Sequence, residues 1–119
     1  VESGDYAIIS GLSGVHQFVK IGAHVMIGGG AMVRKDVPPF ITAAGEPLSY
    51  AGVNSVGLKR RNFSQEEINE IQTLYRTLYQ SGMNVSQAVN RIKETYSKGP
   101  EADAILNFIE RSDRGLIRK

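Results

Sequence analysis

The chain has no cysteine and only two histidines among its 119 residues. Without cysteine the fold cannot depend on disulfide bonds, and this composition favours a reducing compartment. A tetrahedral zinc site usually needs three or four nitrogen or sulfur ligands, which two histidines cannot supply. We therefore expect a protein without disulfide bonds and without a metal centre.

Long apolar runs and a strong charge of one sign are also missing. No run approaches the roughly 18 apolar residues that a membrane-spanning helix needs, so no membrane insertion is expected. The formal net charge is only +2, and the basic residues follow no single long face, which argues against nucleic-acid binding. The sequence has no nucleophile elbow, no Walker loop and no dinucleotide-binding fingerprint. With 41% hydrophobic and 22% charged residues, the composition is typical of a soluble globular protein.

What the chain does have is a hexapeptide-like repeat near its N-terminal end. A period of six fits neither an α-helix nor an alternating strand, and it is typical of the hexapeptide repeat of a parallel β-helix. If three hexads make one coil, residues 3–38 form two coils, and we expect further coils before them because the repeat is already running at Ser3. One aliphatic set of the repeat is Ile9, Val15, Ile21, Ile27 and Val33, and the set at the fourth following position is Ser13, Val19, Val25, Ala31 and Val37.

The repeat stops at Pro38 and Pro39, because consecutive prolines lack backbone donors and restrict the residue before them. After one more extended segment, the chain becomes a glycine-punctuated connector in which the pattern indicates no regular structure. We divide the chain into the last coils of a solenoid (1–45), a connector (46–62) and a small helical domain (63–119).

Three amphipathic helices are expected in the helical domain. The first begins behind a capping-box pattern of Ser64 and Glu67, and Gly82 fits its end. The second extends from about residue 85 to 96, and the third from about 100 to 111. The inward face of the first helix should contain Ile68, Ile71, Leu74, Tyr75 and Leu78.

Several polar residues of the solenoid are candidates for binding. His16 and Arg34 are large polar residues at corner positions where the other hexads have small residues. His16 and Gln17 can both donate and accept hydrogen bonds. The alternative for His16 is an ordinary surface corner. His24 either meets a like residue across a trimer axis or is a partly solvated turn residue. The glycines at 28–30 are structural, or leave a shallow groove for a ligand.

The connector carries a cationic cluster. Lys59, Arg60 and Arg61 offer the guanidinium forks and the ammonium that bind a phosphate or diphosphate. The alternative is a solvated charge run ahead of a helix. Asn54 could recognise the edge of a base through its amide.

Several of these stretches together resemble one enzyme family. The chain is similar, nearly throughout, to the C-terminal part of the acyl carrier protein:UDP-N-acetylglucosamine O-acyltransferases of lipid A biosynthesis. The stretches that carry the resemblance are 14–18, 21–26, 35–40, 52–61 and 111–118.

The resemblance implies a mixed β and α fold, the end of a left-handed parallel β-helix followed by a small α-helical C-terminal domain. It also implies a cytoplasmic homotrimer that transfers an R-3-hydroxyacyl group from acyl carrier protein to the 3-hydroxyl of UDP-N-acetylglucosamine, the first step of lipid A biosynthesis. No metal or organic cofactor takes part in this family. The general-base histidine of the family is expected before Val1, so the 119 residues alone are predicted to be inactive.

Site residues follow from the same resemblance. His16 and Gln17 match a pair that lines the cleft near the sugar and the diphosphate. Asn54 and Arg60 match nucleotide-binding positions, and Arg61 matches an arginine that reaches a phosphate in a neighbouring subunit's site.

Three further residues match the acyl-chain groove, namely His24, Met26 and Gly29. The residue at Gly29 acts as a length ruler in the family, and because glycine has no side chain we expect a long acyl chain, of about fourteen carbons or more. Two alternatives remain at this stage. The segment is a non-catalytic unit for trimerisation or scaffolding, or it belongs to a related sugar-nucleotide N-acyltransferase.

Overall fold

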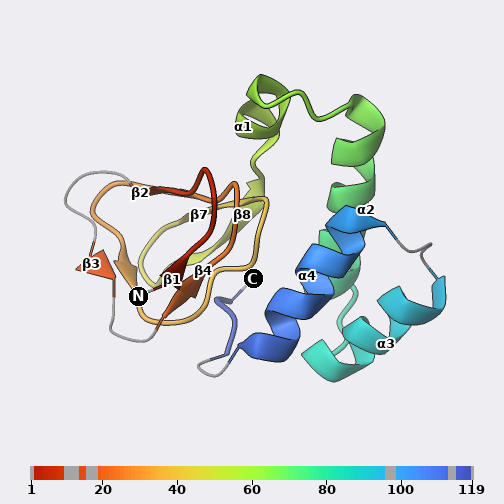
Figure 1. Cartoon of the computed structure of the whole chain (residues 1–119). Helices are drawn as coiled ribbons and strands as arrows, with labels where there is room; N and C mark the ends of the chain where they lie inside the picture. Colours follow the sequence, from red (N-terminus) through yellow and green to blue (C-terminus); the bar gives the residue numbers. More distant parts are fainter. Residues whose placement is uncertain (1, 10–13, 16–18, 96–98, 113–114, 119) are drawn as a thin grey trace.

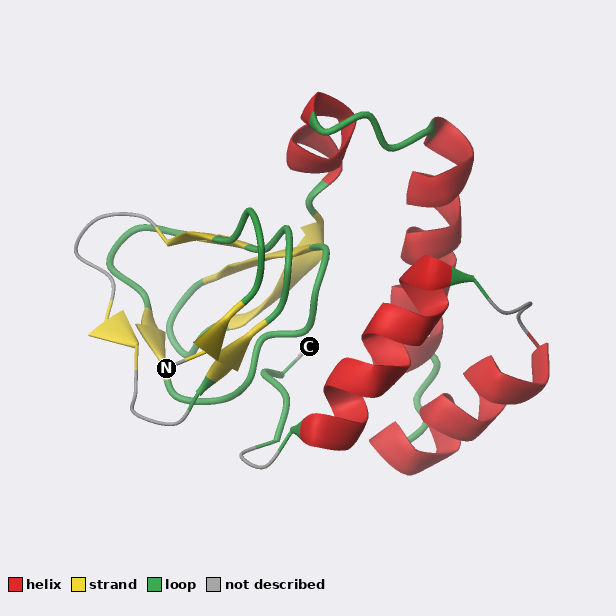
Figure 2. Ribbon diagram, viewed as in Figure 1, coloured by secondary structure: helices red, strands yellow, loops and turns green. Residues whose placement is uncertain are grey.

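The computed structural model describes residues 2–9, 14–15, 19–95, 99–112 and 115–118. A solenoid of short strands forms one side of the molecule, and the longer helices stand along the other side (Figure 1). Figure 2 shows the same separation of strands from helices. The described strands are β1 (Glu2–Ser3), β2 (Ile8–Ile9), β3 (Gly14–Val15), β4 (Lys20–Ile21), β5 (Met26–Ile27), β6 (Met32–Val33), β7 (Ile41–Ala44) and β8 (Ser49–Val53). The described helices are α1 (Ser55–Arg60), α2 (Gln65–Gln80), α3 (Val85–Thr95) and α4 (Pro100–Arg111).

The register of the strands gives the length of one coil. β1 pairs with β4, β2 with β5 and β3 with β6, and all three pairs are parallel. In each pair the partners lie three hexads apart along the chain, as in Ile8 with Met26 and Gly14 with Met32. The prediction that three hexads complete one coil is therefore confirmed.

The aliphatic residues of the hexads form the interior of the solenoid. Ile21, Ile27 and Val33 are at most 2% exposed, and Val19 and Val25 are fully buried. From residue 19 onward the hexad period thus marks the side chains that point inward, whereas Ile9 of the same aliphatic set is 38% exposed.

The last coil is shorter than the one before it. β7 pairs with β5 in parallel, and Met26 is opposite Thr42. Three full hexads would have placed Ala44 opposite Met26, so this coil is two residues shorter. β8 then returns antiparallel to β7. The connector consequently contains β8 and the short helix α1, which the sequence pattern does not indicate. β8 is only half-buried along most of its length, so no clean alternation of apolar and polar residues marks it.

The helices follow the sequence prediction closely. Ser64 Oγ accepts a hydrogen bond from the Glu67 amide at 3.1 Å, and Glu67 Oε1 accepts one from the Ser64 amide at 2.8 Å, which confirms the capping box. Gly82 has a φ of +79°, as expected of a residue just after a helix. The predicted inward face of α2 is confirmed, with Ile68, Ile71, Leu74, Tyr75 and Leu78 all buried.

Tyrosines attach α2 to the end of the solenoid. The Tyr75 hydroxyl donates to the Pro39 carbonyl at 2.5 Å, and the Tyr79 hydroxyl donates to the Ile117 carbonyl at 3.0 Å. Tyr50 of β8 stacks on both rings, with centroids 5.6 Å from Tyr75 and 4.7 Å from Tyr79. Burial raises the pKa of the Tyr75 hydroxyl well above its usual value, so it is a stable neutral donor.

The C-terminal tail returns to the solenoid and pairs with it at two places. Asp36 bridges in parallel with Leu116, and the Ile117 amide donates to the Asp36 carbonyl at 2.9 Å. Further along, the Tyr50 amide donates to the Arg118 carbonyl at 2.8 Å. Backbone pairing, which leaves no periodicity in the sequence, thus fixes the tail in place.

Candidate functional site

Three rings form a column at one corner of the solenoid. Tyr6 and His24 are separated by one full coil, and His24 and Phe40 by the shortened coil that follows it. Each of the three has a positive φ, between 58° and 73°, a backbone conformation that bulky residues rarely adopt. The His24 ring lies 5.1 Å from the Tyr6 ring and 5.8 Å from the Phe40 ring, stacked in both cases. The corner is therefore a conformationally demanding place that the coils build repeatedly.

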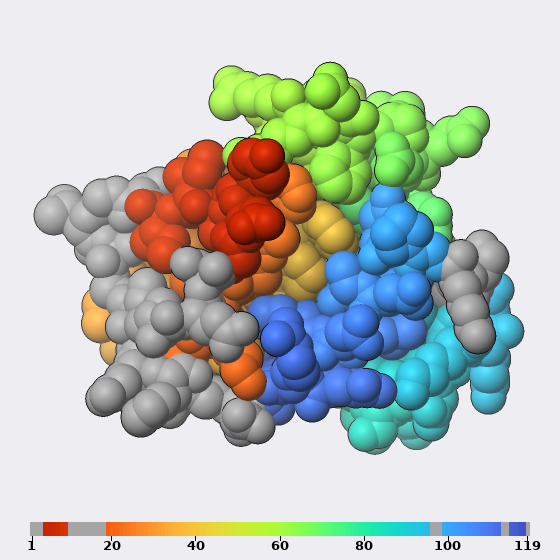
Figure 3. All heavy atoms as spheres, viewed as in Figure 1, coloured from red at the N-terminus to blue at the C-terminus, as the bar shows by residue number. Residues whose placement is uncertain are grey.

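The end of the connector and the first residue of the helical domain pack against this column. The edge of the Phe63 ring faces His24 at 5.1 Å, and the guanidinium carbon of Arg61 lies 4.9 Å from the centre of the Tyr6 ring. Figure 3 shows the segment around α1, in yellow-green, adjoining the N-terminal coil in red. Arg61 thus makes a cation–π contact with the column rather than extending freely into solvent.

Two polar atoms in this corner have no hydrogen-bond partner among the described residues. They are Nδ1 of His24 and Nη1 of Arg61, and both are buried. Burial lowers the pKa of His24, the charge of Arg61 lowers it further, and Asp5 opposes the shift. His24 is therefore neutral at pH 7, and Arg61 keeps one buried donor that no described residue uses.

Asn54 is held by two hydrogen bonds. Its Oδ1 accepts from the Gly57 amide at 3.2 Å and so caps α1, and its Nδ2 donates to the His24 carbonyl at 3.0 Å. A Cβ on Gly57 would lie 2.5 Å from Asn54 Nδ2, so the absence of a side chain there allows this arrangement. The structure consequently brings Asn54, Arg61 and His24 together, whereas the Arg60 side chain is exposed on α1.

The other predicted residues are distributed along the solenoid. Met26 belongs to β5, the strand after His24, and Gly29 lies in the exposed turn that follows β5. His16 and Gln17 lie outside the described residues. The described residues contain no group of three or more His, Cys, Asp or Glu side chains that could hold a metal ion, and none of their helices is long and apolar enough to cross a membrane.

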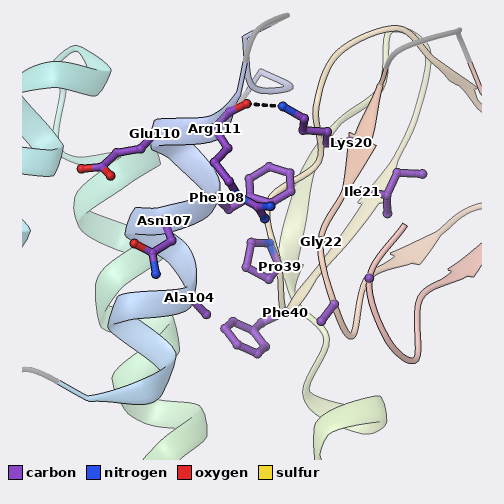
Figure 4. Close-up of a pocket in the computed structure, with 12 residues that line it drawn as sticks. Lys20, Ile21, Gly22, Pro39, Phe40, Ala104, Asn107, Phe108, Glu110 and Arg111 are labelled. Carbon is purple, nitrogen blue, oxygen red and sulfur yellow. Dashed lines mark hydrogen bonds between the residues drawn. The ribbon is translucent and has the colours of Figure 1, made fainter. Parts of the chain in front are cut away.

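A cavity of about 590 Å³ separates the solenoid from α4 (Figure 4). Ile21 and Pro39 line one side, and Ala104 and Phe108 of α4 face them. The Lys20 ammonium donates to the Arg111 carbonyl across one end. Phe40 belongs to the column and also lines this cavity. Among the described residues, none of the site residues predicted from the sequence lines it.

The lowered pKa of His24 predicts a pH dependence of stability. Because the folded pKa lies below the usual 6.5, the unfolded chain takes up a proton first as the pH falls below about 6.5, and stability decreases through that window. His24→Phe keeps a ring in the column and should flatten this dependence. Urea unfolding at about pH 7.5 and about pH 5.5 measures the effect for both proteins. His16 is present in both proteins, so its own contribution cancels in the comparison. If the free energy of unfolding fell by the same amount between the two pH values in both proteins, the prediction would be contradicted.

Comparisons with known proteins agree on one family. A family profile described as Udp N-acetylglucosamine O-acyltransferase, Domain 2, matches residues 36–117. An acyl-[acyl-carrier-protein]–UDP-N-acetylglucosamine O-acyltransferase of Burkholderia orbicola is 45% identical over 122 residues, covering 99% of this chain and 47% of the relative. The enzyme of the same name from Thiobacillus denitrificans is 44% identical, covering 98% of this chain and 45% of the relative. The chain spans about half the length of the curated relatives it matches.

Solved structures give the same result. A UDP-N-acetylglucosamine acyltransferase from Bacteroides fragilis matches with a TM-score of 0.95 and 46% identity, over 98% of this chain and 46% of that chain. The corresponding protein of Acinetobacter baumannii matches with a TM-score of 0.91 and 37% identity, over 98% of this chain and 45% of that chain.

Coils built from three hexads are the architecture of the hexapeptide-repeat proteins. Within that class, the coverage of the chain and the sequence identity to the relatives distinguish one family. The chain belongs to the UDP-N-acetylglucosamine O-acyltransferase family. The resemblance found in the sequence is therefore confirmed.

Three residues of the site were missed in the sequence. Tyr6, Phe40 and Phe63 surround His24, yet the hexad pattern marks only aliphatic and small positions. The recurrence of a ring at the same place in successive coils, in Tyr6, His24 and Phe40, is the signal that could have identified the column.

Proposed function

We propose that the chain supplies substrate-binding residues of an enzyme that transfers an R-3-hydroxyacyl group from acyl carrier protein to the 3-hydroxyl of UDP-N-acetylglucosamine. The names of the relatives support O-acyl transfer between acyl carrier protein and UDP-N-acetylglucosamine, and the hydroxyacyl group and the 3-hydroxyl are our proposal. In this proposal the enzyme is a cytoplasmic homotrimer with a left-handed solenoid. Its general base is a histidine outside these 119 residues.

The observation that carries the proposal is the orphaned Nη1 atom of Arg61. A buried guanidinium donor without a partner is costly, and a substrate phosphate would satisfy it with a charge-assisted hydrogen bond. The Tyr6 ring and the end of α1 hold the Arg61 side chain in this corner, and a small shift of the guanidinium would bring Nη1 to a phosphate. A unit that served only trimerisation or scaffolding would not need this unpaired cation.

The Asn54 amide has two roles in this proposal, one structural and one in nucleotide binding. Its oxygen and its nitrogen are both engaged within the chain, but Nδ2 keeps a second hydrogen that can meet a nucleotide carbonyl. Asn54 thus positions α1 and, with Arg60 and Arg61, contacts the nucleotide. His16 and Gln17 contact the sugar and the diphosphate in the proposed complex.

Titration with UDP-N-acetylglucosamine tests the nucleotide assignment. In an enzyme with the full length of the relatives, Arg60→Ala should weaken binding by about tenfold, the usual effect of losing one charge-assisted contact. Lys93→Ala, which removes an exposed cation on α3 away from the cationic cluster, is the matched control and should leave binding unchanged. Unaffected binding in Arg60→Ala, or equal losses in both variants, would remove the support for nucleotide binding at α1.

The proposed acyl groove runs past His24 and Met26 to Gly29. Glycine at this exposed turn leaves room for a long chain, whereas Gly29→Met should shift the preference to acyl chains shorter by several carbons. Competition between acyl carrier proteins loaded with ten-carbon and fourteen-carbon chains, each at about equal concentration, measures the shift as a ratio of kcat/KM. A variant that still prefers the longer chain would show that Gly29 does not set the length. Transfer to the amino group of an amino-sugar nucleotide, rather than to a hydroxyl, would favour the related N-acyltransferases.

A further inference from the structure

A second cavity, of about 400 Å³, lies at the end of the solenoid. The turn after β6, the hairpin of β7 and β8 and the C-terminal tail enclose it. Its floor is apolar, because Leu48 and Ile117 are only 7% and 3% exposed, and Met32 lies at its edge with 43% of its surface accessible. We call this cavity the end groove.

Every ionisable residue that lines the described part of the end groove is a cation. These residues are Arg34, Lys35 and Arg118, and all three are exposed. Arg34 also forms an ion pair with Glu46 at 3.4 Å, but both side chains are more than 60% exposed, so this pair is weak. The end groove therefore has a positive rim above an apolar floor.

Regular backbone pairing holds the rim in place. Arg118 is fixed by its parallel bridge to Ser49 and by the hydrogen bond from the Tyr50 amide to its carbonyl. Arg34 and Lys35 directly follow β6, which is paired with β3. Cations from two segments far apart in the sequence thus converge on one cavity.

We propose that the end groove binds an anionic amphiphile, with its phosphate or carboxylate head on the three cations and its alkyl chain on the apolar floor. Guanidinium forks and an ammonium suit an oxyanion, and the volume lies within the range of small-molecule sites. The floor is concave and buried, so it accepts one alkyl chain rather than presenting a protruding surface to a bilayer. Among the described residues, none of those assigned to the nucleotide or the acyl groove lines it, so this proposal does not depend on the proposed function.

A series of alkyl phosphates tests the proposal on the full chain. Inorganic phosphate, butyl, hexyl and octyl phosphate are titrated by calorimetry below their micellar concentrations. Each added methylene should tighten binding by about threefold to fourfold until the floor is covered, because each one leaves water for an apolar surface. Equal affinity for inorganic and octyl phosphate would overturn the proposal in favour of a simple anion site. Binding confined to phosphatidylglycerol vesicles, or binding of a polyglutamate peptide as tight as that of octyl phosphate, would overturn it too.

Two variants separate the head site from the floor. Lys35→Ala should weaken octyl phosphate binding by about fivefold to tenfold, and Lys93→Ala, an exposed lysine on α3, is its matched control. Met32→Gln should reduce the gain per methylene without abolishing binding of the head, and Val85→Gln is its control at an equally exposed apolar position. All four positions are at the surface, and circular dichroism verifies that each variant is folded. Losses in the controls equal to those in the groove variants would overturn the proposal.

Discussion

Arg61→Ala is expected to weaken the binding of UDP-N-acetylglucosamine by about 30- to 150-fold, because the variant loses charge-assisted hydrogen bonds worth about 2–3 kcal/mol. Nη1 of Arg61 is buried and has no partner in the described residues, and in the proposed complex the substrate phosphate would complete its hydrogen bonding. The expected loss is larger than for Arg60, whose side chain is exposed. Isothermal titration calorimetry on an enzyme with the full length of the relatives measures it.

Arg61→Lys is the informative companion to this variant. Lysine keeps the positive charge but lacks the planar fork, and it stacks less well on the Tyr6 ring. We therefore expect it to recover only part of the lost affinity. Full recovery by lysine would mean that charge alone matters, and an alanine variant that binds as tightly as the wild type would refute the phosphate assignment.

Asp36→Ala is expected to lower the free energy of unfolding by about 2 kcal/mol, because the loss of the carboxylate leaves two partly buried donors without their acceptor. Its side chain is fully buried, and it accepts hydrogen bonds from the Lys20 amide at 2.7 Å and from the Ser112 hydroxyl at 2.5 Å. These bonds connect the second coil, the end of the repeat and the segment after α4. Urea unfolding monitored by circular dichroism provides the measurement.

Two matched variants test this explanation. Ser112→Ala removes only one donor to Asp36 and should cost about 1 kcal/mol. Asp103→Ala removes an exposed carboxylate from α4 and should cost less than about 1 kcal/mol, the size of a helix-dipole contribution. If Asp36→Ala were no more destabilising than Asp103→Ala, the buried carboxylate would not help to hold the segment after α4 on the solenoid.

The repetitive and amphipathic parts of this fold could be predicted because their side chains follow one period. Ile21, Ile27 and Val33 mark the inside of the coils, and Ser64 with Glu67 marks the start of α2. The family could also be identified from the sequence. The boundaries proposed between the solenoid, the connector and the helical domain stay predictions.

Other parts of the fold could not be predicted because their stability comes from distant partners. β8 is defined by its pairing with β7 and by the stacking of Tyr50 on two tyrosines of α2, and neither leaves a local pattern. The same holds for Asn54, whose amide joins the start of α1 to the distant carbonyl of His24. The side chain was expected to bind a nucleotide, and its structural hydrogen bonds became evident only in three dimensions.

The shortened last coil and the returning strand β8 have a consequence for assembly. A parallel solenoid that ended on a full coil would expose a flat edge, on which another chain could stack and extend the sheets into a filament. Here the last coil is out of step with the period of the coils before it, and β8 is antiparallel to β7, the neighbouring strand of its sheet. Tyr75 and Tyr79 of α2 then cover the outer strand through Tyr50. Growth of the four-stranded sheet by a further parallel strand is thereby hindered at its β8 edge.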